Sequence, residues 1–67
     1  MVTLQSYRGI SAGDVAILKN GREVVIKGLE VYTSEGASLG IALVHTEGGA
    51  NIRPSEVKGY LFQKRND

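Results

Sequence analysis

Apolar residues occur along the chain in short runs separated by polar or glycine-containing segments. The runs recur about every eight to twelve residues, a spacing typical of an all-β domain. Asn20-Gly21 lies between two such runs and predicts a type I′ turn, because both central residues of that turn need positive φ. We therefore expect residues 14–19 and 22–33 to form a hairpin. Both faces of the first arm are apolar, so the pattern does not show which face points toward the core.

The second arm of this hairpin changes phase in its middle. Val24 and Ile26 alternate on one face, whereas Leu29 and Val31 alternate on the other. A β-bulge at Gly28 would return all four side chains to one face, and it would bend the strand as a small barrel requires. The outward positions are then Lys27, Glu30 and Tyr32.

The second half of the chain predicts three more strands. Residues 39–46 form the third strand, with an inward set of Leu39, Ile41 and Leu43 and an outward set of Gly40, Ala42, Val44 and Thr46. Residues 50–53 form a short fourth strand that ends at Pro54, because proline has no backbone donor. A helical turn follows at residues 54–57, where Val57 fills the core, and Gly59 releases the chain into a last strand at residues 60–63. Residues 1–11 add an edge strand or cross the barrel mouth, and we expect the tail at 64–67 to fray.

Composition limits the classes of protein that this chain can belong to. It has 67 residues, enough for one domain at residues 1–67, and a net charge of +1. It has no cysteine and one histidine, so we expect no metal site and no cofactor. We find no apolar run long enough to span a membrane and no signal peptide, and from these absences we expect a cytoplasmic protein without a membrane partner.

The strand plan resembles a known small fold. Five strands, a long bent second strand and one helical turn before the last strand resemble the SH3-like barrel of Tudor and KOW domains. The stretch from GDVAILKNG through LGIALV to ANIRPSEVKGYL is also similar to the plasmid-borne type II dihydrofolate reductases. That family has Val-Gln-Ile-Tyr before a proline, whereas this chain has Ala50-Asn51-Ile52-Arg53 before Pro54. The resemblance implies a shared fold, and the changed motif separates the chain from that activity.

A weaker resemblance concerns the Sm-like barrels. Residues 18–21 with Gly28 resemble their first motif, and residues 51–53 resemble their second. The glycine spacing here is longer than in that family, and no long N-terminal helix precedes the barrel. This resemblance implies a nucleic-acid-binding alternative that uses the same outward residues.

The residues with the chemistry for catalysis all have simpler structural interpretations. His45 shares the parity of Leu43 near a strand end, so we interpret it as a residue capping the rim of the core. Three acids, Glu35, Glu47 and Glu56, lie in or beside turns, where solvated carboxylates are common. The glycine-containing segment at residues 34–40 lacks the Lys-Ser/Thr pair and the following helix of a phosphate-binding loop. We therefore predict no catalytic residue.

Two outward surfaces remain as candidates for binding. Basic groups beside an aromatic ring and an amide should share one curved face; these are Lys27, Tyr32, Asn51 and Arg53. A second, smooth apolar strip is the predicted subunit interface, made of Val25, Ala42 and Val44 with Gly40.

These surfaces predict a small non-catalytic binding module that acts through protein contacts and self-associates as a homo-oligomer. The first alternative is a nucleic-acid-binding barrel of the KOW or Sm-like type. The second is an oligomeric enzyme that resembles type II dihydrofolate reductase. The small size suggests an accessory protein of a phage or mobile element.

Overall fold

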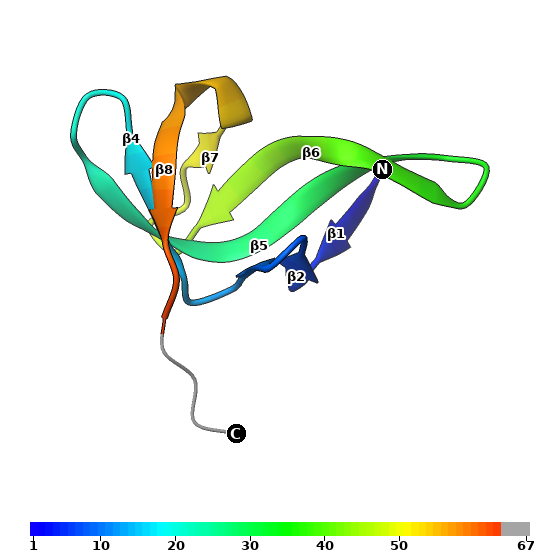
Figure 1. The fold of residues 1–67 in the computed structure, drawn as a ribbon, viewed down its shortest axis with the longest axis horizontal. Helices are drawn as coiled ribbons and strands as arrows, with labels where there is room; N and C mark the ends of the chain where they lie inside the picture. The colour runs from blue at the N-terminus through cyan, green and yellow to red at the C-terminus, as the bar shows by residue number, and fades with distance from the viewer. Residues whose placement is uncertain (64–67) are drawn as a thin grey trace.

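A long bent strand, β5 (Glu23–Ser34), connects the two halves of the structure, as the computed structural model in Figure 1 shows for residues 1–63. One edge of β5 pairs with β4 (Val15–Leu18) near its start and with β1 (Val2–Leu4) further along. The opposite edge pairs with β6 (Ala37–Thr46) over almost its whole length. Every one of these pairings is antiparallel, so β5 belongs to both halves of the sheet.

Shorter elements complete the sheet on either side. β7 (Asn51–Ile52) pairs with the end of β6, and β8 (Val57–Leu61) pairs with β4. The strand order is therefore β7-β6-β5-β4-β8, with β1 beside β5. A 3₁₀ helix, η1 (Pro54–Glu56), joins β7 to β8. Near the N-terminus, a small hairpin of β2 (Ser6–Tyr7) and β3 (Ile10–Ser11) forms a second sheet.

The prediction of an all-β chain with one helical turn before the last strand is confirmed. The prediction of a closed barrel is not confirmed, because the path ends at β7 and β8 and these strands do not pair. Pro54 follows β7 closely and removes a backbone donor, so β7 is too short to continue around the sheet. β8 also begins at Val57, three residues earlier than predicted, and Gly59 pairs with Ile17 inside the strand. The predicted fray at 64–67 lies outside the described residues.

The turn between β4 and β5 differs from the predicted two-residue type. Gly21 has a φ of 89°, but Asn20 is not among the residues with positive φ. The Gly21 amide donates to the Leu18 carbonyl at 2.9 Å, and the Leu18 amide donates to the Arg22 carbonyl at 2.8 Å. This pattern is a type I turn followed by a left-handed glycine, which is the usual three-residue hairpin loop. Asn20 contributes through its side chain, which accepts a hydrogen bond from the Arg22 amide.

The predicted bulge in β5 is confirmed by the strand register. Ile26 pairs with Thr46 and Gly28 pairs with His45, so Lys27 is the extra residue in β5. The shift places the apolar side chains of both halves of β5 in one core. Its fully buried residues are Ala16, Ile26, Leu29, Val31 and Val44, with Ile10 and Leu18 beside them.

The predicted orientation of β6 is wrong over much of its length. Glu30 pairs with Leu43 and Val31 pairs with Ile41, so Ala42 is an extra residue on β6, and the next register shift leaves out Leu39. Each bulge reverses the alternation of side chains. As a result Val44 and Thr46, which we expected to face outward, are buried, and the Leu39 side chain is 64% exposed.

A buried aspartate, Asp14, links three segments of the chain that are far apart in sequence. Asp14 is fully buried; its Oδ2 accepts a hydrogen bond from the Ser11 amide at 2.8 Å, and its Oδ1 accepts one from the Gln63 amide at 2.9 Å. The Asp14 carbonyl also accepts from the Ile26 amide at 2.8 Å. Asp14 therefore holds the turn before β4, the middle of β5 and the residues after β8 in one place.

Candidate functional site

The outer face of the β5-β6-β7 meander carries the candidate site. Residues directly opposite each other on antiparallel strands project from the same face. Glu30 on β5 pairs with Leu43 on β6, and His45 on β6 pairs with Asn51 on β7. These four side chains therefore line one surface, together with the outward Lys27 from the bulge in β5.

A polar pocket of about 350 Å³ lies at the end of this face nearest the bulge. Lys27 supplies an ammonium group, and His45 and Asn51 supply an imidazole and an amide. β1 and the residue after it contribute Thr3 and Gln5 from the other side. The remaining lining residues are Gly28, Thr46 and Gly49. We call this cavity the lysine pocket.

A chain of polar contacts crosses three strands beside the lysine pocket. His45 Nδ1 lies 2.8 Å from Asn51 Oδ1, so Nδ1 is the donor of this hydrogen bond. The other ring nitrogen, Nε2, lies 3.8 Å from Glu30 Oε1. The contacts hold the imidazole between β5 and β7. The prediction that His45 caps the core rim is therefore wrong: its parity with Leu43 is as expected, but the bulge at Ala42 turns both side chains to the outer face.

A second pocket, of about 470 Å³, continues the same face toward the N-terminal residue. Tyr32 and Pro54 present apolar surface, and the Tyr32 side chain is 52% exposed. Arg53 supplies a guanidinium group, and Glu30 lines the pocket on the β5 side. The other lining residues are Met1, Ile41, Ala42, Leu43 and Ser55. We call this cavity the tyrosine pocket.

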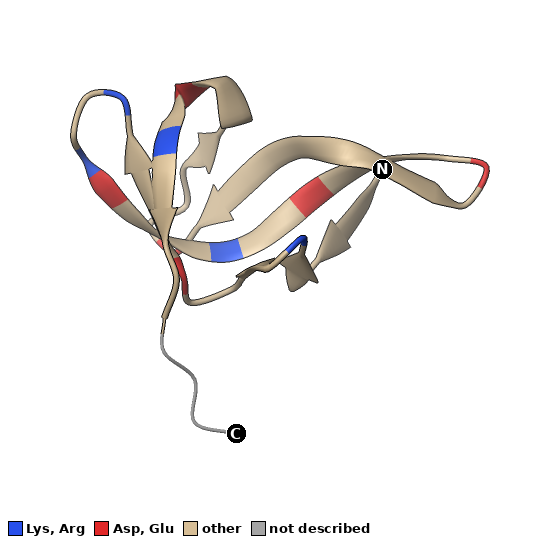
Figure 2. Ribbon diagram, viewed as in Figure 1, with Lys and Arg blue, Asp and Glu red and all other residues tan. Residues whose placement is uncertain are grey.

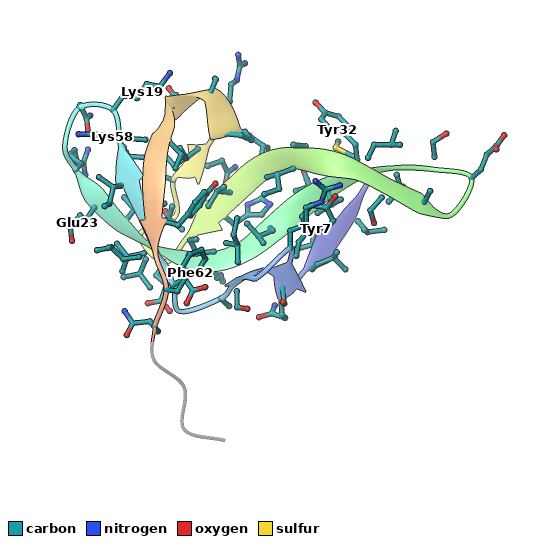
Figure 3. The ribbon with its side chains drawn as sticks, in the orientation of Figure 1. Tyr7, Lys19, Glu23, Tyr32, Lys58 and Phe62 are labelled. Atoms are coloured by element: carbon teal, nitrogen blue, oxygen red, sulfur yellow. The ribbon has the colours of Figure 1, made fainter. Side chains whose placement is uncertain are left out.

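The structure divides the four predicted binding residues between these two pockets. Lys27 and Asn51 line the lysine pocket, whereas Tyr32 and Arg53 line the tyrosine pocket. The pockets adjoin, because Glu30 of the second contacts His45 of the first. The four residues thus lie on one face, and we name its two adjoining pockets together the meander groove. Figure 3 shows Tyr32 on the β5-β6 arm, well away from Lys58 and Phe62 near the β4-β8 end.

The three residues of the predicted interface do not form one strip. Val44 is fully buried in the core and cannot contact a partner, which corrects the prediction. Ala42 is half-buried in the tyrosine pocket, while Val25 is 40% exposed on the other half of the sheet. The reason is again the bulge in β6. Because Ala42 is the extra residue, its side chain and that of Val44 point to opposite faces of the sheet.

An apolar row does exist on the outer face of the β4 half. Val25 and Leu61 both pair with Val15, one from each neighbouring strand, and their side chains are 40% and 49% exposed. Ile17 follows two residues after Val15 on the same face and is half-buried. This row, which we call the β4 strip, contains only one of the three predicted interface residues.

Charge is distributed without a single-sign face over the described residues. Figure 2 shows basic and acidic segments interspersed along the ribbon from the β4-β5 turn to the tip of the β5-β6 arm. Glu30 lines the tyrosine pocket together with Arg53, and it lies 3.8 Å from His45 of the lysine pocket. A surface that binds nucleic acid through its phosphates needs a clustered positive potential, and this surface lacks one.

Metal-binding clusters are not found in the part of the chain that the structure describes. No cluster of three or more His, Cys, Asp or Glu side chains there could hold a metal ion. The Thr46 hydroxyl in the lysine pocket donates to the Ala50 carbonyl at 2.8 Å, so it is not presented as a nucleophile. The groove is therefore equipped to form hydrogen bonds, ion pairs and apolar contacts.

Several groove residues were not predicted as site residues. To predict Glu30 and Leu43 as site residues, one needs the register between β5 and β6. To predict Thr3 and Gln5, one needs the pairing of β1 with β5. The sequence shows that His45 and Leu43 project from the same face of the strand. It does not show that this is the outer face, because that depends on a bulge at Ala42, where no glycine marks the position.

Comparisons with known proteins give no match: no family model, no curated protein and no solved structure is similar to this chain. Within residues 1–63, no helix has the length and apolar character needed to cross a membrane.

Proposed function

We propose that this protein is a non-catalytic binding module whose meander groove holds an extended segment of a protein partner. One observation carries the proposal: outward side chains of three strands, Glu30 on β5, Leu43 and His45 on β6 and Asn51 on β7, line two adjoining pockets on a single face. Pockets that combine a few polar groups with an exposed ring can orient a peptide and bury one of its apolar side chains. The absence of cysteine supports a cytoplasmic site of action.

The strand order supports an SH3-like plan, in which one bent strand is shared by both halves of the sheet. Small sheets of this kind host many unrelated activities, so the groove and not the fold supports the function. The interspersed charge in Figure 2 weighs against the nucleic-acid alternative. Arg53 at the position before Pro54 weighs against a pore of the type II dihydrofolate reductase kind, because symmetry would gather several like charges there.

The β4 strip supports self-association as a second property of the module. Val25 and Leu61 flank Val15 on adjacent strands, and they form a continuous exposed apolar row. Light scattering tests this property: a dimer that becomes a monomer in the Leu61→Lys variant supports it. A monomeric wild-type protein at high concentration rejects it without affecting the peptide groove.

The experiment for the groove is selection from a display library of random linear peptides, followed by ¹H–¹⁵N NMR titration with a selected peptide. We expect shifts at groove amides and weaker binding by Tyr32→Ala. Lys58→Gln, on the distant β8, is the matched surface control. A mixed-sequence oligonucleotide is titrated in parallel. Failure to select any peptide, together with salt-sensitive oligonucleotide binding, rejects the proposal and supports the nucleic-acid alternative.

A further inference from the structure

We infer that the lysine pocket is a subsite for an acidic side chain, so that the meander groove selects peptides with an aspartate or glutamate at a fixed distance from an apolar residue. This inference rests on the proposed function, because it specifies what the groove recognises. The acidic side chain enters the lysine pocket, and the apolar side chain enters the tyrosine pocket.

The first argument is the chemistry of the lysine pocket. Its lining contains the Lys27 ammonium, the Gln5 amide and the Thr3 hydroxyl, and it contains no carboxylate. Lys27 is exposed, and among residues 1–63 it forms no ion pair. An ammonium group surrounded by neutral donors matches a ligand carboxylate, since hydrogen bonds with an ionised partner are the stronger kind.

The second argument is the fixed direction of the Asn51 amide. Asn51 Oδ1 accepts the hydrogen bond from His45 Nδ1. The Nδ2 group, which is a donor only, is therefore turned away from His45 and remains as a donor for a ligand. The same contact orients the imidazole and the Asn51 amide relative to each other, so the Asn51 donor has a defined direction in the pocket.

The third argument concerns the single acid of the groove. Glu30 lies between the two pockets, and its Oε1 faces His45 Nε2 at 3.8 Å. Its negative charge is therefore directed at the imidazole, whereas Lys27, the extra residue of the β5 bulge, lies three residues before Glu30 on the same strand. A ligand acid in the lysine pocket meets Lys27 directly, whereas an acid in the centre of the groove would meet Glu30 and be repelled.

The fourth argument gives the spacing of the peptide motif. Lys27 and Tyr32 lie five residues apart on β5, and Lys27 is the extra residue of the bulge, so at about 3.3 Å per residue the two positions are roughly 13–16 Å apart. An extended peptide has nearly the same rise. The acidic and apolar residues of the ligand should therefore be about four or five positions apart.

The test uses peptides selected from the random linear library, with dissociation constants measured by fluorescence anisotropy. We expect the selected peptides to share one acidic and one apolar position at that spacing. Changing the peptide acid to its amide should weaken binding about tenfold. Lys27→Gln should weaken the acidic peptide equally but leave the amide peptide unchanged, and Lys58→Gln should change neither. Lys27→Glu should select peptides with a basic residue instead.

The outcomes separate this inference from the proposed function. Selected peptides that shift groove amides but carry no acidic preference overturn the inference and leave the binding module intact. Equal effects of Lys27→Gln on acidic and amide peptides also overturn it. Failure to obtain any groove-binding peptide overturns the proposed function and, with it, the inference.

Discussion

Replacement of Asp14 by alanine is expected to remove a large part of the stability of the fold. The Asp14 carboxylate is fully buried and accepts hydrogen bonds from the Ser11 and Gln63 amides at 2.8 and 2.9 Å. A hydrogen bond to a charged group contributes about 1.5–3 kcal/mol. Loss of both should therefore cost about 3–6 kcal/mol.

That loss is large compared with the stability that a chain of 67 residues can have. At about 0.05–0.15 kcal/mol per residue, the free energy of unfolding is roughly 3–10 kcal/mol. Thermal unfolding followed by circular dichroism is a suitable assay, because each kcal/mol corresponds to about 4–8 °C for a domain of this size. We expect Asp14→Ala to melt tens of degrees below the wild type, or to be unfolded at room temperature.

Two further variants test the role of the Asp14 carboxylate if Asp14→Ala does not fold. Gln63→Pro removes the amide donor of the longer-range hydrogen bond and also fixes φ at residue 63, so it should cost at least about 1.5–3 kcal/mol. Glu47→Ala removes one negative charge from an exposed turn and should change the free energy of unfolding by less than about 0.5 kcal/mol. If Asp14→Ala melted within a few degrees of Glu47→Ala, the buried carboxylate would not be the link that we describe.

Three other predictions concern single side chains. Glu35 has a φ of 52° in the turn between β5 and β6, so Glu35→Asn should raise the melting temperature by a few degrees; an unchanged or lower value would contradict this. The Tyr7 hydroxyl is buried without a hydrogen-bond partner among residues 1–63, so Tyr7→Phe should stabilise the protein by about 1 kcal/mol in urea denaturation, and a clear destabilisation would show a missed contact. Burial raises the pKa of Tyr60 above 10.0, which means that the folded state favours the neutral phenol. Stability should therefore be unaffected by this group below pH 10 and should fall as the pH rises further, with a shallower fall in Tyr60→Phe; equal slopes would exclude the effect.

The sequence predicted the elements of the fold because turn residues and alternating apolar positions have local causes. The bulge at Gly28 could be predicted since Val24 and Ile26 are out of phase with Leu29 and Val31, with polar residues between them. The bulges of β6 could not, because residues 39–44 are all apolar or glycine and either phase satisfies them. The direction of every β6 side chain then depends on tertiary packing.

The candidate site shows the same division. The outward directions of Lys27 and Tyr32 could be predicted from the alternation of apolar residues in β5. Lys27 lines the lysine pocket and Tyr32 lines the tyrosine pocket. The contacts of His45 with Asn51 and Glu30 depend on how three strands are aligned, which no local pattern encodes. The failure to predict β1 as a wall of the lysine pocket has the same cause.

The pairing of β4 with β8 also constrains how the chain can fold during synthesis. The β5-β6 hairpin joins neighbouring segments, whereas β8 must return across some forty residues to reach β4, and Gln63 must be present to meet Asp14. While the nascent chain ends before β8, the edge of β4 that pairs with β8 remains accessible, and the Gln63 amide is not yet present to donate to Asp14. Until those last residues leave the ribosome, the groove-bearing half of the sheet can assemble, while the β4 edge is open to non-native strand pairing.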